Sequence, residues 1–449
     1  KAKSVGDRIF AGTVNGDGLL RARIEATAED NTIARVVRLV EEAQESKAPT
    51  ERFIDRFSRF YTPAVLIVAM LVAVVPPLAL GGDWTSWIYK GLAILLIGCP
   101  CALVISTPAA VAAGLSAGAR RGLLMKGGAV LETIGRIDAV AFDKTGTLTR
   151  GRPLVTDVEA FDGETAETVL ALAAGLDVGS SHPLALAVLA EAERRGIAAA
   201  TAVDVAAVPG KGVEGRIDGR AVFLGSVAAT EAVAPLDTAA RGRIEALSRE
   251  GRSVSIVVRD GVALGLLAMR DEPRPDAEHG IRTLEAAGIR AVMLTGDNRA
   301  TAEAIGRDLG IDVRAQLLPQ DKQRIVRELR VAGERVAKVG DGINDAPALA
   351  EADVGIAMGG GTDVALETAD AAVLHGRVGD VADMVALSRA TMANIRQNIA
   401  VALGLKVVFL VTTVVGITGL WPAILADTGA TVLVTANAMR LLAWKGSAA

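Results

Sequence analysis

The chain is poor in cysteine, histidine and aromatic residues, and it has no excess of positive charge. Its 449 residues include two Cys, three His and 3% aromatic residues, and the formal net charge is −4. The sequence contains no Cys-x-x-Cys pair, so these residues include no soluble metal-binding head of that kind. No basic patch interleaved with aromatic residues is present, so nucleic acid is excluded as an expected partner.

Long apolar stretches account for the mean hydropathy of +0.38 and the hydrophobic content of 51%. Four stretches approach or exceed the roughly 20 residues that a bilayer-spanning helix needs, at 62–81, 87–117, 398–419 and 421–443. Arginine and lysine flank each pair of stretches, whereas the turns inside the pairs carry almost no positive charge. By the positive-inside rule, the pattern predicts an integral membrane protein with its central segment and both chain ends in the cytoplasm. The alternative is a large soluble protein with four buried helices.

The segment DAVAFDKTGTLTRG at 138–151 places a carboxylate at the end of an apolar strand. A tight Thr/Gly turn follows Asp143 and leaves its side chain at the carboxyl end of the strand, where open α/β sheets carry their chemistry. An aspartate in that position can attack phosphorus and form an aspartyl-phosphate.

Two further apolar strands end in polar turns, IRAVMLTGD at 289–297 and VAKVGDGINDAP at 336–347. The Thr295 hydroxyl and backbone amides of the first turn can hold phosphate oxygens. Mg²⁺ prefers hard oxygen ligands, which the carboxylates of Asp143 and Asp341 can supply. Lys322, at the start of the amphipathic helix in LLPQDKQRIV, would neutralise charge on a transferred phosphoryl group.

The run DKTGTLT, Asp143 to Thr149, is the signature of the P-type ATPases, and the ordered motifs resemble that family's phosphorylation domain. The strand and turn also resemble phosphatases of the haloacid dehalogenase superfamily, which carry a general acid/base Asp two residues after the nucleophile. Thr145 stands there in this chain, so the acyl-phosphate is expected to persist. The resemblance implies that the catalytic residues are Asp143, Lys144, Thr145, Thr295, Gly296, Asp297, Lys322, Asp341, Asn344 and Asp345, with Mg²⁺ on Asp143, Thr145 and Asp341.

Residues 276–375 alternate helical and apolar strand patterns, which predicts a parallel, doubly wound sheet. Residues 152–270 interrupt that sheet with strands and helices of their own and are expected to form an inserted domain. In the heavy-metal branch of the family, an SxHP-type segment and a GxG loop form the ATP site. The resemblance implies nucleotide contacts from His182, Pro183, Gly210 and Gly212, with Asp177 standing where the family usually has Glu.

The second apolar stretch contains GCPCAL, in which Pro100 separates Cys99 from Cys101. Proline removes a helix hydrogen bond and frees carbonyl groups, so a loosened turn would bring both thiols toward one cavity. Thiolates select Zn, Cd, Pb or Cu(I) over Mg or Ca, although buried cysteines also serve as small apolar fillers. A disulfide is not expected, because residues two apart on a helix point in different directions. Cys-Pro-Cys inside a span resembles the heavy-metal-transporting P-type ATPases.

Lys406 and Asp427 are ionisable residues inside apolar stretches, where each costs about 2.5–3.5 kcal/mol. They can pair with each other, or Asp427 can bind a divalent ion and pair with Lys406 after the ion leaves. The segments NIRQNIAVALGLK and ILADTGATVLVTANAMRLL resemble the zinc/cadmium/lead exporters of bacteria. The resemblance implies that both residues join Cys99 and Cys101 in the transported-ion site. A carboxylate also favours Zn²⁺ over Cu⁺.

The expected fold class is multidomain. It combines an α-helical transmembrane bundle, an α/β haloacid-dehalogenase-like phosphorylation domain, an inserted α+β nucleotide-binding domain and part of a β actuator domain. The expected boundaries are 1–30 (C-terminal part of the actuator domain), 31–61 (linker helix), 62–118 (two transmembrane helices), 119–151 and 271–395 (phosphorylation domain), 152–270 (nucleotide-binding domain) and 396–445 (two transmembrane helices). The actuator's TGE loop is expected to lie before Lys1, so an N-terminally truncated fragment is expected.

These features together predict ATP-driven transport of Zn²⁺, and also of Cd²⁺ and Pb²⁺, through an aspartyl-phosphate, with Mg²⁺ as cofactor and ATP as substrate. The direction, export, is what the resemblance implies. The resemblance implies a monomer in the bacterial inner membrane with cytoplasmic catalytic domains. Three alternatives remain. Asp427 and Lys406 argue against a Cu⁺ transporter, and Thr145 argues against a membrane-anchored dehalogenase-type phosphatase. The intact nucleophile argues against a metal sensor that only binds.

Overall fold

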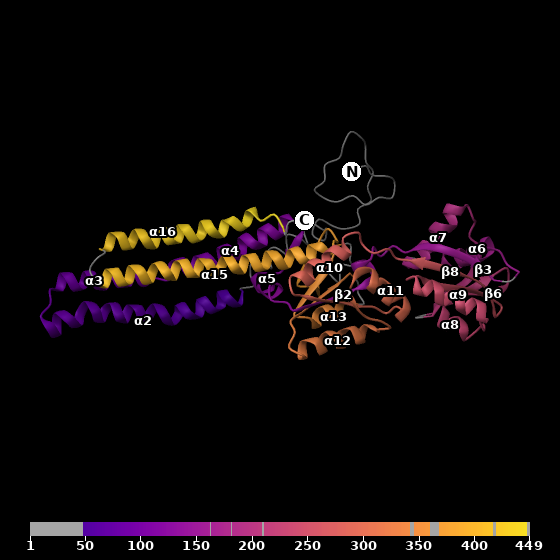
Figure 1. Cartoon of the computed structure of the whole chain (residues 1–449), viewed down its shortest axis with the longest axis horizontal. Coiled ribbons are helices and arrows are strands. Elements are labelled where there is room, and N and C mark those ends of the chain that lie inside the picture. Colours follow the sequence, from indigo (N-terminus) through magenta and orange to yellow (C-terminus); the bar gives the residue numbers. More distant parts are fainter. Residues whose placement is uncertain are drawn as a thin grey trace, which may run out of the picture. The chain divides into compact units, whose positions relative to one another are not determined.

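The computed structural model describes residues 48–161, 163–180, 182–208, 211–341, 345–359, 368–415 and 419–446. The chain divides into two compact units. The first comprises Lys1–Arg136, Asp370–Leu374 and Asp383–Ala449, and the second Ile137–Ala369 and His375–Ala382. The predicted actuator segment 1–30 and part of the predicted linker helix lie outside the described residues. The multidomain architecture is confirmed, because long helices dominate one unit and two separate sheets the other (Figure 1).

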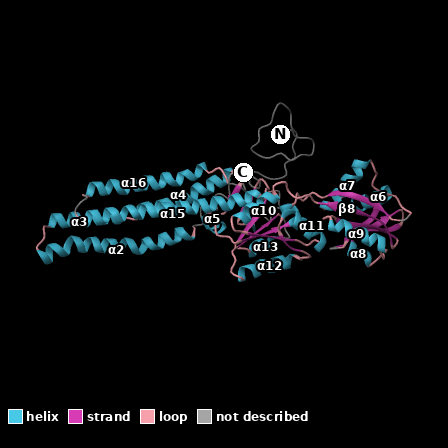
Figure 2. Ribbon diagram, in the orientation of Figure 1, coloured by secondary structure: helices cyan, strands magenta, loops and turns pink. Residues whose placement is uncertain are grey.

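Five long helices make up most of the first unit (Figure 2). They are α2 (Pro49–Leu80), α3 (Trp84–Gly98), α4 (Cys101–Arg120), α15 (Gly379–Val414) and α16 (Leu420–Met439), accompanied by the shorter α5 (Gly128–Ile134), η3 (Arg440–Ala443) and the antiparallel strands β1 (Leu123–Met125) and β13 (Ala371–Val373). Among the described residues, Pro49–Leu80, Trp84–Arg120 and Gly379–Thr413 are long and apolar enough to cross a membrane. The 20-residue α16, which covers the fourth predicted span, is not among them, so its crossing remains a prediction.

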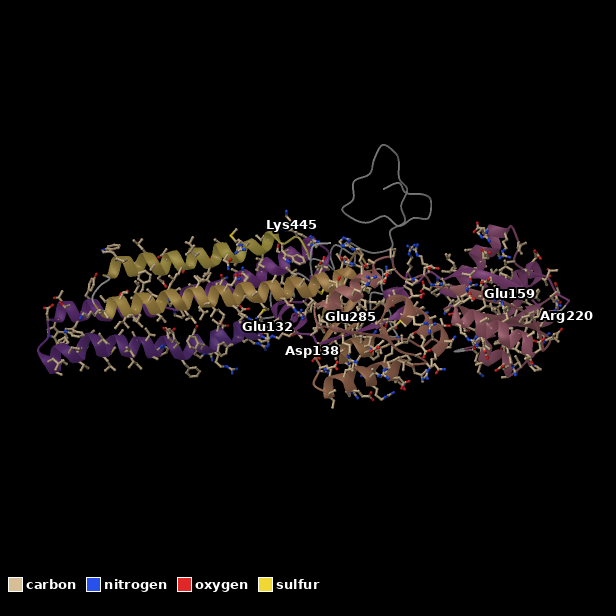
Figure 3. The ribbon with its side chains drawn as sticks, in the orientation of Figure 1. Glu132, Asp138, Glu159, Arg220, Glu285 and Lys445 are labelled. Carbon is tan, nitrogen blue, oxygen red and sulfur yellow. A yellow bond between two sulfur atoms is a disulfide. The ribbon has the colours of Figure 1, made fainter. Side chains whose placement is uncertain are left out.

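The exposed side chains along α2 are mostly apolar, as is typical of a helix that faces lipid (Figure 3). Leu66, Ile67, Met70 and Leu71 are 49–61% exposed. The helix is continuous from Pro49, so no break separates the predicted linker at 61 from the first predicted span at 62. In the same way α15 passes without a break through the predicted boundary at residue 396.

The second predicted span is two helices. Cys99 has an extended backbone, with φ −61° and ψ 123°, and ends α3. Pro100 has φ −79° and ψ 30° and precedes α4, which begins at Cys101. Pro100 has no N–H to donate to the preceding turn, which favours a break at this position. Proline alone does not end a helix in this chain, because Pro108 lies inside α4.

Parallel strands form the core of the phosphorylation domain, as the sequence pattern predicts. They are β2 (Ala139–Asp143), β9 (Arg290–Leu294), β10 (Asp312–Arg314), β11 (Val336–Gly340) and β12 (Val354–Met358), which pair in the order β12-β11-β2-β9-β10. Every residue of β2, β11 and β12 is buried, as expected when helices cover both faces of a parallel sheet. The accompanying helices are α10 (Ala277–Ala286), α11 (Arg299–Leu309), α12 (Pro319–Val331) and α13 (Ala346–Glu351).

The inserted domain has an antiparallel sheet of its own. Its strands are β3 (Leu154–Ala160), β4 (Ala202–Val208), β5 (Gly212–Ile217), β6 (Arg220–Ser226), β7 (Ser253–Arg259) and β8 (Val262–Arg270), in the order β3-β8-β7-β6-β5-β4. Helices α6 (Ala166–Asp177) and α7 (Pro183–Arg195) pack on one face, and α9 (Thr238–Arg249), with the short α8 (Val227–Glu231) beside it, on the other. Val257 faces the first helix pair and Ile256 the second, as strand alternation requires.

Candidate active site and intramembrane cluster

The strand order brings the three predicted catalytic turns to one edge of the parallel sheet. β2 lies between β9 and β11, with Asp143 in register with Leu294 and Phe142 with Val339. The turns that follow these strands therefore place Thr295 and Asp341 on either side of Asp143. Asn344 lies outside the described residues.

Asp143 is buried and bound by a lysine from a distant part of the chain. The Lys322 ammonium donates to Oδ1 of Asp143 and, over 3.0 Å, to Oδ1 of Asp345. Burial raises the pKa of Asp143 and Asp345 raises it further, whereas Lys338 and Lys322 oppose both. Burial alone would lower the pKa of Lys322, but the charges of Asp143 and Asp345 outweigh it, so the pKa is raised. Lys322 thus remains a cation beside the nucleophile.

Three carboxylates gather at this edge. Oxygens of Asp143, Asp341 and Asp345 lie within 4.8 Å of one another. Burial raises the pKa of Asp341 to about 6, and the charges of Asp143 and Asp345 contribute. Clustered carboxylates of this kind repel one another unless a cation joins them, so their chemistry fits a hard divalent ion such as Mg²⁺. Asp143 and Asp341, two of the predicted Mg²⁺ ligands, both belong to this cluster.

The turn after Asp143 depends on a glycine. Gly146 has φ +70°, and a Cβ on this residue would lie 1.5 Å from Oδ2 of Asp341. The side chain of Thr145 is exposed and therefore available to a ligand. Lys144 is buried, and its ammonium donates to Asp297 over 2.5 Å, which ties this turn to the turn after β9.

In the TGD turn, Thr295 is buried and its Oγ1 accepts from the backbone N–H of Asp297 over 3.1 Å. Gly296 beside it is exposed. The predicted residues of this turn therefore lie at the sheet edge, with the backbone of Gly296 open to a phosphate oxygen.

Two basic residues of this region were not singled out from the sequence. Arg274 donates to the carbonyl oxygens of Gly146 (2.6 Å) and Thr147 (2.8 Å), and so holds the turn that carries Asp143. Lys338 lies wholly buried in β11. A usable signal for Lys338 was its position inside the apolar strand VAKVG, whereas Arg274 lies in a polar segment where a charge is ordinary.

Asp271 accepts from Oγ1 of Thr149 over 2.5 Å and from the backbone N–H of Arg152. Thr149 is the last residue of the DKTGTLT run. Asp271 thereby connects that run to the segment returning from the inserted domain.

Asp177, His182 and Pro183, three of the predicted nucleotide residues, lie at the junction of α6 and α7, whereas Gly212 opens β5. Asp177 is the last residue of α6, and His182 is the N-cap of α7, where Nδ1 accepts from Leu184 N–H and Pro183 opens the helix. Burial raises the pKa of Asp177 to about 6. Gly212 has φ +153°, and a Cβ there would lie 2.1 Å from the carbonyl oxygen of Leu224. Gly210 lies outside the described residues.

The inserted domain also contains a cavity of about 720 Å³, lined among others by Lys211, Glu214 and Phe223. Phe223 packs in the α9 core, so this cavity opens on the face opposite to α6 and α7. Neither Asp177 nor His182 lines it. The cavity therefore does not test the predicted nucleotide contacts.

The intramembrane residues converge on one lysine. The Lys406 ammonium donates to Oδ1 of Asp427 over 2.7 Å and to the carbonyl oxygens of Ile97 and Cys99. The carbonyls freed by the break before Pro100 thus have a partner. The expectation that no disulfide forms is wrong for this structure, in which Cys99 and Cys101 are bonded. It assumed one continuous helix, whereas Cys99 lies outside α4 and its side chain can turn toward Cys101.

Residues 137–353 match the family model described as haloacid dehalogenase-like hydrolase. The chain is 52% identical over 440 residues to the zinc/cadmium/lead-transporting P-type ATPase of Escherichia coli (strain K12), covering 98% of this chain and 59% of the relative. It is 43% identical over 449 residues to the probable cadmium-transporting ATPase of Staphylococcus aureus (strain MRSA252), covering 98% of this chain and 62% of that one. The crystal structure of a zinc-transporting PIB-type ATPase in the E2.Pi state is similar at 53% identity with a TM-score of 0.74, over 93% of this chain and 68% of the other.

The parallel sheet, its strand-end Asp143 and the matching family model define the second unit as a haloacid dehalogenase-like domain. The comparisons extend over nearly the whole chain and include its membrane helices. The chain belongs to the heavy-metal-transporting P-type ATPase family. It spans about three fifths of the length of the curated relatives it matches.

Proposed function

We propose that the protein containing this chain transports divalent heavy-metal ions, Zn²⁺ first and Cd²⁺ and Pb²⁺ with it, out of the bacterial cytoplasm at the expense of ATP. The single observation that carries the proposal is the buried strand-end Asp143, bound by Lys322, in a chain whose membrane helices bring Asp427 beside the Cys-Pro-Cys segment. The names of the similar proteins support the choice of ions.

Asp143 is the nucleophile of the proposed phosphoryl transfer. A carboxylate oxygen attacks the γ-phosphorus of ATP, the bond to the bridging oxygen breaks, and ADP leaves with the electron pair. Lys322 neutralises charge on the transferred group. When Mg²⁺ is bound, it lowers the charge of the phosphate oxygens and so favours attack by an anion. Asp143 and Asp341 would hold that ion.

The turn around the nucleophile is held from two sides. Arg274 fixes the carbonyls of Gly146 and Thr147, and Lys144 is tied to Asp297. The reacting carboxylate therefore enters the reaction already oriented, which lowers the entropy loss of reaching the transition state. The exposed Thr145 provides no carboxylate to activate water, which supports a lasting acyl-phosphate.

Transport requires the ion to compete with Lys406. In this structure the Lys406 ammonium is bonded to Asp427, so a divalent ion that takes Asp427 as a ligand must displace it. Cys99 and Cys101 would contribute soft thiolate ligands in their reduced form, which favours Zn²⁺, Cd²⁺ and Pb²⁺ over Mg²⁺. Return of Lys406 to Asp427 would then assist release of the ion.

The test is formation of acid-stable phosphoenzyme from γ-labelled ATP, using the complete protein in detergent with reductant. Labelling is measured with chelator, with Zn²⁺ and with Cu⁺, in the wild type and in Asp143→Asn and Asp427→Ala. Asp312→Asn, which removes an exposed carboxylate at the start of β10, and Thr435→Ala on α16 are the matched controls.

Labelling that needs Zn²⁺, persists in both controls and disappears in Asp143→Asn and Asp427→Ala is the expected result. Labelling that responds to Cu⁺ and survives Asp427→Ala would instead support a copper transporter. Rapid release of inorganic phosphate with no labelled intermediate would support a phosphatase. No phosphoryl transfer under any metal would favour a sensor.

A further inference from the structure

β11 carries a lysine in the middle of an otherwise apolar buried strand. Lys338 has no exposed side-chain surface, although lysine is among the residues least often buried. Its registered neighbours on the two adjacent strands are small, Ala141 on β2 and Gly355 on β12, which leaves room beside them for a long side chain. A buried ammonium is strongly unfavourable unless it has polar partners.

The partners of Lys338 lie at the phosphorylation site. Its ammonium donates to the carbonyl oxygen of Val339 over 2.9 Å and lies 3.7 Å from Oδ1 of Asp345. The same oxygen of Asp345 accepts from Lys322 over 3.0 Å, and Lys322 also donates to Asp143. Asp345 is therefore a buried carboxylate between two ammonium groups, only one of which reaches the nucleophile.

This arrangement has an electrostatic consequence. Two buried lysines lie among the three clustered carboxylates, so each ammonium group offsets part of their negative charge. Without Lys338 less of that charge would be offset, and among the described residues Lys322 would be the one remaining ion-pair partner of Asp345. A more negative site attracts Mg²⁺ more strongly and repels phosphate more strongly. A Lys322 ammonium that moves toward Asp345 also interacts less strongly with Asp143.

We propose that Lys338 is a positioning residue of the phosphorylation site, a second buried cation that shares Asp345 with Lys322 and thereby sets the relative affinities of the site for Mg²⁺ and for phosphate. This inference rests on the proposed phosphorylation of Asp143. Lys338 acts through Asp345 and touches no reacting atom. Burial lowers the pKa of Lys338, and the charges of Asp345 and Asp143 partly oppose that effect.

Lys338→Met is the first test, because methionine keeps the length and apolar stem of the side chain but removes the charge. Two quantities are measured on the complete protein. One is the Mg²⁺ concentration that gives half of the Mg²⁺-induced rise in melting temperature. The other is the concentration of labelled inorganic phosphate that half-saturates Asp143 by the reverse reaction, in which carboxylate and phosphate condense with loss of water.

The two quantities are expected to move in opposite directions. In Lys338→Met the Mg²⁺ concentration that gives half of the rise in melting temperature should fall by roughly fivefold to tenfold. The phosphate concentration that half-saturates Asp143 should rise by a comparable factor. Lys338→Arg keeps the charge and should stay near the wild type in both.

Unchanged half-saturation values in Lys338→Met would overturn the proposal, as would parallel weakening of both ligands with a lowered melting temperature, which a packing role predicts. Changes of the two half-saturation values in Lys338→Arg that are as large as those in Lys338→Met would also overturn the proposal. If Lys338→Met does not fold, Lys338→Gln provides the same comparison with a polar neutral side chain. A wild type that takes no label from phosphate would contradict the proposed function, whereas the Mg²⁺ melting series would still decide the role of Lys338.

Discussion

At the scale of single residues, the active site is a set of buried charges that hold one another. Lys322 is the central member, because it alone among the described residues donates to both Asp143 and Asp345. Lys322 comes from the start of α12, more than a hundred residues from Asp143, so the pair exists only when the parallel sheet is complete. The sequence indicated Lys322 by its place at a helix start but not its sharing between two carboxylates.

Lys322→Met should therefore reduce the rate of phosphoenzyme formation by about 100-fold or more. Removal of the ammonium raises the pKa of Asp143 further, since burial and Asp345 already raise it, and it leaves the transferred group without its cation. Rapid-quench labelling measures the rate. Arg327→Met, on the exposed side of the same helix, is the control and should label normally. A near-normal rate in Lys322→Met would show that the Lys322 contact is not part of the transfer.

Asp177 offers a prediction about pH. Its carboxyl ionises near 3.8 in the unfolded chain and at about 6 in the folded one, because burial disfavours the charge. Between these values the folded state binds more protons, so stability falls as the pH rises through this window and stays lower above it. Asp177→Asn should thus stabilise the inserted domain at pH 7.5, by about 2–3 kcal/mol at most, and have little effect near pH 4.

The melting temperature of the protein at both pH values measures this effect, with the exposed Asp312→Asn as the matched carboxylate control. A gain for Asp177→Asn at pH 7.5 that disappears at low pH is the expected pattern. A loss at pH 7.5 would mean that the ionised Asp177 has a stabilising partner, and the pKa argument would then be wrong.

At the scale of elements, a strand could be predicted from the sequence where its own run of apolar residues indicates that it is buried. The apolar runs that end at Asp143, Leu294 and Gly340 read as buried parallel strands, and their ends meet as predicted because parallel strands share one edge. Arg274 could not be found in this way, because its role depends on which carbonyls lie near it after folding. Lys338 contradicts the pattern of its own strand, and only the position of Asp345 explains it.

Helix boundaries in the first unit were less predictable. Residues 49–80 become more apolar along the chain, but α2 continues through that change without a break. The Cys-Pro-Cys segment shows the opposite case. The sequence indicates a kink, whereas the structure ends one helix and starts another, because Lys406 supplies hydrogen bonds to the Ile97 and Cys99 carbonyls that a continuous helix would have satisfied itself.

Pro100→Ala should therefore weaken metal binding without touching the phosphorylation site. An alanine at residue 100 restores a backbone donor and favours a continuous helix from α3 to α4, which turns Cys99 and Cys101 away from each other. The Zn²⁺ concentration for half-maximal labelling from ATP should rise at least about tenfold, and labelling from inorganic phosphate should persist. Pro108→Ala, inside α4, is the matched control. Equal effects of the two substitutions would contradict a special role for the break.

At the scale of the whole molecule, the chain combines a unit that carries the proposed metal ligands with a unit that carries the proposed phosphorylation site. Each group of residues is chemically complete for only half of the proposed cycle. In the proposed cycle, Cys99, Cys101 and Asp427 would provide metal ligands but no energy source. Asp143, Lys322 and Asp341 would provide a phosphorylation site but no soft ligand. The proposed function therefore requires that the chemical state of the first unit govern the reactivity of the second.

The Cys99–Cys101 disulfide allows that requirement to be tested, because a disulfide cannot supply thiolate ligands. Oxidation with diamide should abolish Zn²⁺-dependent labelling of Asp143 from ATP, and dithiothreitol should restore it. Labelling from inorganic phosphate should be unaffected, since both cysteines belong to the first unit. Cys99→Ser cannot form the bond, so its residual labelling should be insensitive to diamide. If oxidised wild-type protein still labels with Zn²⁺, the thiolates are not ligands of the transported ion and coupling between the units must proceed through Asp427 alone.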